Sequence, residues 1–306
     1  IFSLILPTVF YLLLTILVNV AIFMAFRSFS KYDIKTFPAI ITNYGVCVIT
    51  GVIYTGYSQV TQELDTSANW FYLSIALGFI FIGTFYLMAR TTQLRGVSVA
   101  SVASKMSLAI PVIFSLFILK LGTNDLDIWN YTGIILAYVA ILLVSKKKAN
   151  PLTNKQPLTL KYIALPLAVF LLGGVIDTTL NYANHHFVTE STEPIFPIFI
   201  FGFAFIIGLV TALAQGVKFR KKDILGGIYL GVPNYFSIYF QLKALSAFDN
   251  NGAILYPSLN IGIIIISTLA AVLLFKEKLS KINMIGVVLA VVVILLLSHQ
   301  EILKAI

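Results

Sequence analysis

The chain has 306 residues, of which 59% are hydrophobic and only 11% are charged, whereas a soluble globular protein carries about 25% charged residues. This composition excludes an ordinary soluble enzyme and predicts a helical protein that crosses a membrane several times. The net charge of +9 would suit nucleic acid as a partner, but the positions of the basic residues assign them another role. Cys47, the single cysteine, excludes an internal disulfide.

Ten apolar segments follow one another along the chain, and each is long enough to form a helix across a hydrocarbon core of about 30 Å. In chain order they are residues 2–27, 37–57, 69–90, 97–120, 128–145, 162–184, 194–217, 224–245, 252–275 and 282–299. The longest connection, residues 146–161, divides the chain almost in half. We therefore expect one all-α membrane domain of ten transmembrane helices, with an N-terminal five-helix repeat over residues 1–150 and a C-terminal repeat over residues 151–306.

The basic residues are distributed unevenly between the two ends of these segments. Seventeen of the 21 Lys and Arg residues lie in the connections after odd-numbered segments, whereas the connection "SQVTQELDTSAN" after the second segment is acidic. Basic residues in short loops mark the cytoplasmic side of a membrane, so both termini are predicted to face outward. The basic excess therefore indicates topology, and we expect a lipid bilayer rather than nucleic acid as the partner.

Lys105 lies inside the fourth segment, in the run "GVSVASVASKMSLAIPV". It is about nine residues from the segment's start, or roughly 13 Å, and from that depth a lysine stem reaches the interface only partway. An intramembrane charge costs at least ~2.5–3.5 kcal/mol, and such residues usually face a cavity or a partner. We expect Lys105 to line a transport path; a pairing with backbone carbonyls or an acid, or a shifted segment boundary, is the structural alternative.

Asp177, in "LLGGVIDTTLNYANHHF" of the sixth segment, is the only carboxylate deep in a predicted helix. It lies roughly 22 Å from the same side of the membrane, so its depth differs from that of Lys105 by about 9 Å. This separation is too large for a direct ion pair but suits a zwitterionic molecule between the two charges, or a carboxylate that takes up a proton. The alternative for Asp177 is a cap on a broken helix, helped by Gly173 and Gly174.

Polar residues in other segments are weaker candidates, because each alone is more often a helix–helix contact than a ligand. Together with Lys105 and Asp177 they form the predicted substrate-binding set: Asn43, Tyr44, Asn181, Asn234, Tyr256, Ser258 and Asn260, with Tyr235 and Gln241 beside them. No catalytic or cofactor motif appears. His185 and His186 are adjacent and so do not share a helical face, which argues against a metal site. We expect no enzyme activity, cofactor or metal.

The two halves show a weak internal repeat at an offset of 153 residues. It places Leu126, Asn130, Gly133, Leu136 and Ala137 on Leu279, Asn283, Gly286, Leu289 and Ala290, respectively. Because each half has an odd number of segments, the two repeats must have opposite orientations in the bilayer. Inverted repeats are typical of secondary transporters, which bind substrate near the midplane between the halves.

Two runs, "PVIFSLFILKLGTNDLDIWNYTGIILAYVAILLVS" and "LNIGIIIISTLAAVLLFKEKLSKINMIGVVLAVVVILLLS", resemble the paired closing segments of the ten-helix EamA-type branch of the drug/metabolite transporter superfamily. In "LLFKEKLSKINMIG", Glu277 and Gly286 take the places of the branch's acidic turn and glycine-initiated last helix. In the first half Asn124 replaces the acidic residue, and the termini of many members face the cytoplasm, unlike the prediction here. The resemblance implies a secondary transporter with inverted repeats and no ATP-driven machinery.

These observations predict a secondary active transporter of a bacterial inner membrane that moves small polar solutes by alternating access. A zwitterionic or amino-acid-like substrate is favoured, since Lys105 would meet an anionic group while Asp177 meets a cationic group or carries a proton. A proton-coupled exporter of lipophilic cations is the alternative, against which Lys105 argues. A channel is the alternative from a different class, and an intramembrane enzyme would need a second catalytic group near Asp177.

Overall fold

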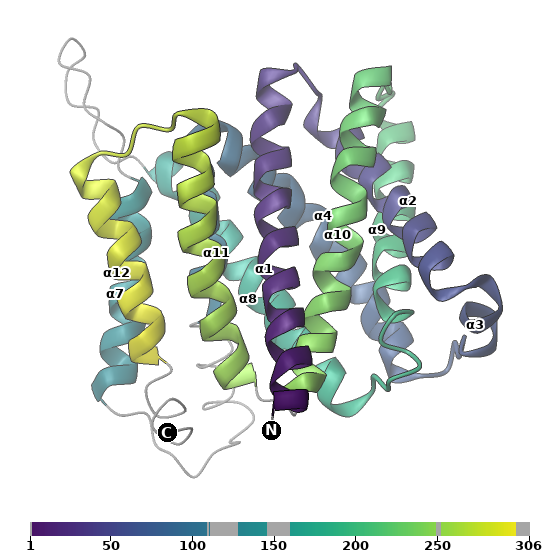
Figure 1. Ribbon diagram of the computed structural model, residues 1–306. Coiled ribbons are helices and arrows are strands. Elements are labelled where there is room, and N and C mark those ends of the chain that lie inside the picture. The colour runs from purple at the N-terminus through teal and green to yellow at the C-terminus, as the bar shows by residue number, and fades with distance from the viewer. Residues whose placement is uncertain (1, 109, 111–127, 146–159, 249–251, 298–306) are drawn as a thin grey trace.

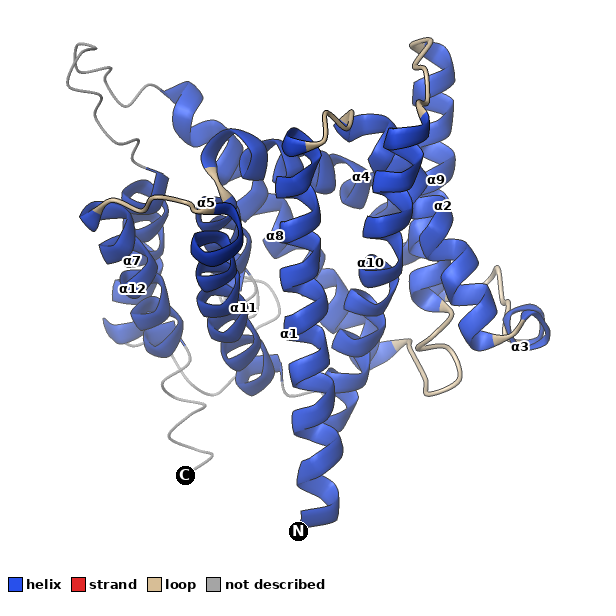
Figure 2. Cartoon of the chain, turned by 45° about the horizontal axis from the view of Figure 1, so that its top comes forward, coloured by secondary structure: helices blue, strands red, loops and turns tan. Residues whose placement is uncertain are grey.

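A computed structural model describes residues 2–108, 110, 128–145, 160–248 and 252–297 (Figure 1). Over these residues the chain forms helices and no strand, which confirms the all-α class (Figure 2). The helices are α1 (Phe2–Lys31), α2 (Thr36–Thr55), α3 (Tyr57–Gln62), α4 (Asn69–Arg95), α5 (Val97–Lys105), the 3₁₀ turn η1 (Met106–Leu108), α7 (Ile128–Ser145), α8 (Leu160–His186), α9 (Phe196–Ala214), α10 (Lys221–Ala247), α11 (Gly252–Phe275) and α12 (Lys281–Leu297).

Nine of the predicted segments coincide, within a few residues at each end, with a long helix of the described chain. The fourth predicted segment carries α5 and η1, and most of its remainder lies outside the described residues, as do Asn124 and most of the connection 146–161. Six helices, α1, α2, α4, α8, α9 and α11, contain stretches that are long and apolar enough to cross a membrane by length and composition. The short helix α3 was not predicted.

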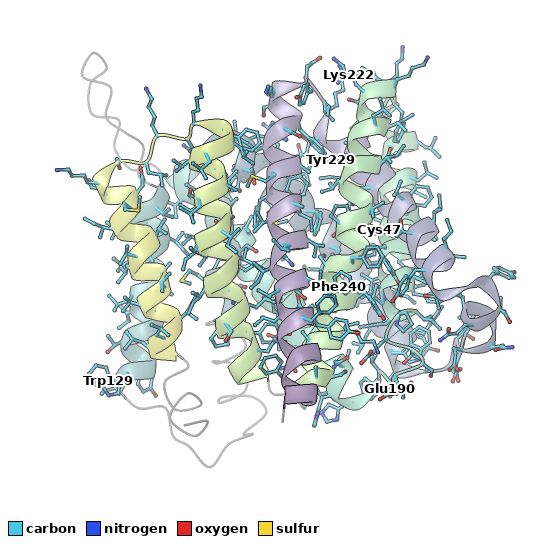
Figure 3. The ribbon with its side chains drawn as sticks, in the orientation of Figure 1. Cys47, Trp129, Glu190, Lys222, Tyr229 and Phe240 are labelled. Carbon is cyan, nitrogen blue, oxygen red and sulfur yellow. The ribbon has the colours of Figure 1, made fainter. Side chains whose placement is uncertain are left out.

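The long helices run side by side and alternate in direction, so the connections gather at two opposite ends (Figure 1). Lys222 lies at one end, and Glu190 and Trp129 lie at the other (Figure 3). At the Lys222 end, the connection after α1 meets the start of α10 through ion pairs of Asp33 with Arg220 and Lys222. We call the end with Lys222 the basic end and the end with Glu190 the acidic end.

The helices pack in a small set of close pairs. α10 packs against α2 and α1, and α4 packs against α9 and α8. α5 lies between α8 and α11, α1 also contacts α11, α2 contacts α9, and α7 packs along α12. Glycines bring α10 close to α2: a Cβ on Gly227 would lie 2.6 Å from the Ala39 carbonyl oxygen, and one on Gly231 would lie 2.9 Å from the Asn43 carbonyl oxygen. Only glycine permits this approach.

The second copy of the Asn-x-x-Gly pattern, at Asn283 and Gly286, has a structural role in the α7–α12 pair. Asn283 Nδ2 donates hydrogen bonds to the carbonyl oxygens of Leu143 (3.2 Å) and Val144 (2.8 Å), which are otherwise left open at the end of α7. A Cβ on Gly286 would lie 2.6 Å from the Val144 nitrogen. Asparagine and glycine one turn apart therefore dock α12 on the last turn of α7.

The outward-facing sides of the helices carry large apolar side chains. Ile53, Leu213 and Leu273 are 78%, 73% and 75% exposed, on α2, α9 and α11 respectively. Soluble monomers rarely expose apolar patches on this scale, because water penalises them. Together with the six long apolar helices, this surface indicates a membrane protein whose perimeter contacts lipid.

Candidate functional site

Lys105 is the last residue of α5, at the point where the α-helix gives way to the 3₁₀ turn η1. Its side chain is buried, with 7% of the residue exposed. Asn260 Nδ2, on α11, donates to the Lys105 carbonyl oxygen at 3.1 Å and so satisfies a carbonyl that the helix end leaves open. The negative end of the helix dipole favours an ammonium at this position. Lys105 therefore lies at the end of an α-helix among buried side chains.

Asp177 is half-buried on α8, and its carboxylate accepts a hydrogen bond from Ser107 Oγ at 3.0 Å. Ser107 Oγ also lies 2.5 Å from the Ser104 carbonyl oxygen. A hydroxyl has a single proton to donate, so Ser107 can bond either the carboxylate or the carbonyl, but not both at once. Asp177 is therefore held by a donor that can switch to another acceptor.

The alternative in which Asp177 caps a broken helix is excluded, because α8 runs without interruption from Leu160 to His186. Gly173 and Gly174 instead make room for the turn that follows Lys105. A Cβ on Gly173 would lie 3.4 Å from Ser107 Cβ, and one on Gly174 would lie 2.5 Å from Ile110 Cβ. The paired glycines thus bring α8 close to the residues that follow α5.

The Lys105 ammonium and the Asp177 carboxylate interact electrostatically but do not form an ion pair within 4.0 Å. Among the described residues, the Lys105 side chain has no hydrogen-bond partner either, although its ammonium carries three donors. Buried charges are normally paired, since an unpaired one is costly. Both groups therefore keep the capacity to bind a further molecule.

Two more side chains complete the surroundings of Asp177. Tyr256, on α11, directs its hydroxyl to the Asp177 main-chain oxygen at 3.4 Å, and the Gln241 carboxamide, on α10, lies within interaction range of the Asp177 carboxylate and the Tyr256 hydroxyl. We call this group the Lys105–Asp177 cluster, and it consists of Lys105, Ser107, Asp177, Gln241, Tyr256 and Asn260. It joins α5, η1, α8, α10 and α11 in the interior of the bundle.

Other predicted site residues lie elsewhere. Asn43 and Asn234 pair with each other between α2 and α10, where Asn234 Nδ2 donates to Asn43 Oδ1 at 3.2 Å, and Tyr44 stacks on the ring of Phe201. All three are fully buried, so they serve as contacts between helices in this conformation. Asn181 is half-buried on α8, one turn beyond Asp177.

Ser258 is a correction to the predicted set, because it is exposed while its neighbours at 256 and 260 are buried. Residues four apart share one face of a helix, and the residue midway between them lies on the opposite face. Ser258 therefore lies on a different face of α11 from Tyr256 and Asn260, which belong to the Lys105–Asp177 cluster.

Sequence reasoning did not assign Ser107 to the site, because a serine two residues after a lysine has no signal of its own. It also missed Glu277 as an interior contact. Glu277 follows α11 at the basic end, and its carboxylate accepts a hydrogen bond from the Val97 amide at 3.1 Å, capping the first turn of the helix that ends in Lys105. Burial raises the pKa of Glu277. Gly96, with φ +103°, permits this approach, since a Cβ there would meet the carboxylate at 2.2 Å.

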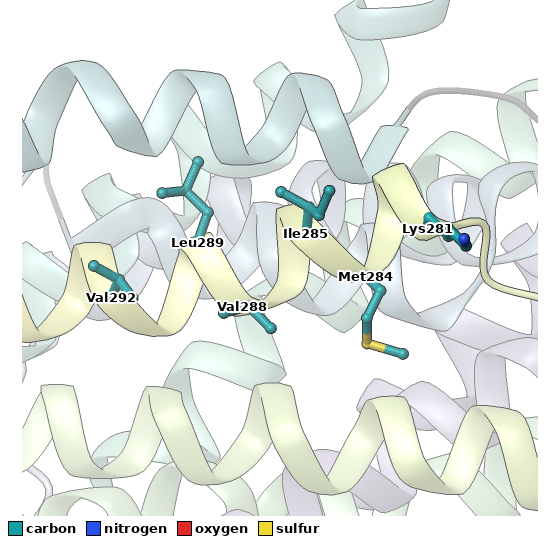
Figure 4. A pocket seen from close by; sticks show the side chains of 6 residues that line it. All are labelled: Lys281, Met284, Ile285, Val288, Leu289 and Val292. Atoms are coloured by element: carbon teal, nitrogen blue, oxygen red, sulfur yellow. The ribbon is translucent and has the colours of Figure 1, made fainter.

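A cavity of about 520 Å³ lies on the outer side of α12, away from this cluster (Figure 4). Its lining is apolar apart from one charged group: Lys281, Met284, Ile285, Val288, Leu289 and Val292. Such a groove suits lipid chains rather than a polar solute. Among the described residues, no three His, Cys, Asp or Glu side chains gather as metal ligands.

Comparisons with known proteins show a shared fold but assign no function. No family model matches the chain. An uncharacterized protein of Haemophilus influenzae is 25% identical over 298 residues, which are 95% of this chain and 98% of that protein. A protein of known crystal structure is 13% identical, covers 94% of this chain and 98% of its own, and superposes with a TM-score of 0.57. At that identity the likeness establishes a shared fold alone, along nearly the whole chain.

Proposed function

We propose that the protein is a secondary active transporter of small polar solutes, with zwitterionic, amino-acid-like molecules as the favoured substrates. The observation that carries this proposal is the Lys105–Asp177 cluster. Two opposite charges lie in the interior of a helical bundle, one of them at the end of α5, and they are not paired with each other. Their chemistry is complementary to a molecule that carries both an anionic and a cationic group.

The pattern of helix packing supports an architecture of ten spans in two inverted five-helix repeats. We number the spans α1, α2, α4, α5 with η1, and α7 in the first repeat, and α8 to α12 in the second. Each span has a counterpart at the same position in the other repeat, so that α1 corresponds to α8, α2 to α9, α4 to α10, α5 to α11 and α7 to α12. When every helix is replaced by its counterpart, the pair α1–α10 becomes α8–α4, α2–α10 becomes α9–α4, and α1–α11 becomes α8–α5. All of these pairs are in contact. The pairs α2–α9, α5–α11 and α7–α12 map onto themselves. This exchange symmetry accords with the resemblance to EamA-type transporters.

The charge asymmetry supports an orientation in a bacterial inner membrane with the basic end in the cytoplasm and both termini outside. The site lies where the two repeats meet, because Lys105 and Ser107 belong to the first repeat and Asp177 belongs to the second. A movement of one repeat against the other changes the distance between the two charges. A zwitterion bound between them neutralises both charges, which lowers the electrostatic cost of that movement.

The direct test is counterflow of labelled amino acids in proteoliposomes, which measures exchange and requires a saturable carrier. Wild type is expected to exchange a zwitterion, whereas Lys105→Ala and Asp177→Asn are expected to lose that exchange while they remain folded. Ser258→Ala, at an exposed position of the same bundle, is the matched control and should exchange normally. Normal exchange by Lys105→Ala would contradict the proposal, and competition by lipophilic cations in that variant would favour the cation exporter. Flux without counterflow would indicate a channel.

A further inference from the structure

Gln241 is the one residue of α10 in the Lys105–Asp177 cluster, and the sequence named it only as a weaker candidate beside the predicted substrate-binding set. It is buried, with 5% of the residue exposed. Its carboxamide lies within interaction range of the Asp177 carboxylate and of the Tyr256 hydroxyl. The residue therefore lies at the proposed binding site rather than on the lipid-facing perimeter.

Within the described residues, the donor capacity of Gln241 is used at most through a long contact with Asp177 or Tyr256. Its Nε2 atom is inaccessible to solvent and forms no hydrogen bond of normal geometry. An amide nitrogen carries two donor protons, so even a small movement toward Asp177 would leave the second proton available. A buried donor without a partner costs about 1–3 kcal/mol, and native proteins seldom retain one unless another molecule satisfies it.

Other donors already serve Asp177. Ser107 Oγ lies 3.0 Å from the carboxylate, and the Tyr256 hydroxyl is directed at the main-chain oxygen at 3.4 Å. Ser107 therefore gives the Asp177 carboxylate a donor that does not depend on Gln241. Its open donor, like the ammonium of Lys105, is suited to an acceptor that the protein does not supply.

We propose that Gln241 is a specificity-determining residue that donates a hydrogen bond from Nε2 to the carboxylate of the solute. This inference rests on the proposed transport function. In an α-amino acid the ammonium and the carboxylate are attached to the same carbon. When Asp177 holds the ammonium of the solute, the Gln241 donor beside Asp177 therefore lies close to the carboxylate of the solute. Lys105 then binds the same carboxylate from the other repeat. A solute without a carboxylate leaves both donors unsatisfied, which is how a hydrogen-bonding site rejects an analogue.

The experiment compares two solutes that differ only in the carboxylate. Counterflow of a labelled amino acid is competed with the unlabelled amino acid and with the amine that its decarboxylation yields. In wild type the amino acid should compete at much lower concentration than the amine. Gln241→Leu keeps the size of the side chain but has no donor, and it should raise the half-saturating concentration of the amino acid roughly 10- to 100-fold, because hydrogen bonds to charged groups are the stronger class. The amine should compete as in wild type.

Ser237→Ala is the matched control, since Ser237 lies one turn before Gln241 on α10, is buried, and bonds the Asn234 carbonyl oxygen instead of the cluster. It should leave the ratio of the two solutes unchanged. Gln241→Glu replaces the donors with acceptors at nearly constant shape, and it should lose the amino acid and retain the amine even if Gln241→Leu fails to fold.

The two proposals fail in different measurements. An equal change for both solutes in Gln241→Leu and Gln241→Glu, or no change for either, would assign Gln241 to packing and overturn the specificity role while wild-type exchange stands. Absence of amino-acid exchange in wild type would overturn the transport function, and the role of Gln241 with it.

Discussion

Substitution of Gly231 by alanine tests a close helix contact, between α10 and α2. A Cβ at this position would lie 2.6 Å from Val46 Cβ and 2.9 Å from the Asn43 carbonyl oxygen. Carbon atoms in contact prefer a separation of about 3.5–4.0 Å, so the two helices must separate locally by roughly 1 Å. Overpacking of this kind costs about 1–3 kcal/mol. Gly83→Ala on α4 is the control, because a Cβ there meets nothing within 4 Å.

Cys47 reports on this contact directly. It is the single cysteine of the chain, it is fully buried, and its Sγ lies 3.2 Å from the Gly231 carbonyl oxygen (Figure 3). A thiol-reactive dye reaches it only when α2 and α10 open. Since about 1.4 kcal/mol corresponds to a tenfold change in an equilibrium constant, Gly231→Ala should accelerate labelling by roughly 5- to 150-fold when opening is rapid and reversible.

Gly83→Ala should label at the rate of wild type or more slowly, because alanine favours a helix over glycine by about 1 kcal/mol. If Gly231→Ala labels at the wild-type rate and unfolds at the same temperature, the glycine does not lie against α2. The packing argument would then be refuted.

Three further predictions concern stability and exchange. Burial raises the pKa of Glu277, so the stability that its protonation contributes is fully present below the ordinary glutamate pKa and is lost as the pH rises through the raised value. In detergent, the unfolding temperature of wild type should therefore rise more than that of Glu277→Gln when the pH is lowered from 7 to 5. Equal rises would contradict this. Asn283→Ala removes two hydrogen bonds to the end of α7 and should destabilise by about 1–3 kcal/mol in the same assay, where an unchanged unfolding temperature would argue against the α7–α12 contact. Gly174→Ala places a Cβ 2.5 Å from Ile110 Cβ, and this overpacking costs about 1–3 kcal/mol next to the Lys105–Asp177 cluster. Amino-acid counterflow should therefore fall at least several-fold relative to Gly83→Ala. Equal exchange by the two variants would show that the site tolerates the displacement of α8.

Much of the helix order could be predicted from the sequence, because hydrophobicity is a local property. An apolar run flanked by charges must form a helix in a bilayer, since its backbone has no other source of hydrogen bonds there. The helices from α7 to α12 begin and end near the predicted residues for this reason. The short helix α3 escaped prediction because its residues, "YSQVTQ", are polar and follow a positive-φ glycine, Gly56.

The candidate site could be predicted only in part. Lys105 and Asp177 stood out because a charge inside an apolar run is costly wherever the helix packs. Serine, asparagine and glutamine carry no such signal, because the same side chain can face a neighbouring helix or the site. Asn43 and Asn234 therefore turned out to join α2 to α10, whereas Gln241 approaches Asp177.

The sequence by itself determined the apolar helices, the basic and acidic ends and the two unusual charges, because composition and charge are read along the chain without knowledge of neighbours. Only the tertiary structure decided that α5 ends at Lys105, that Gly173 and Gly174 admit the following turn, and that Ser258 is exposed. Each of these depends on which face of one helix meets which face of another. That choice is made by packing among all the helices together, and no single segment contains it.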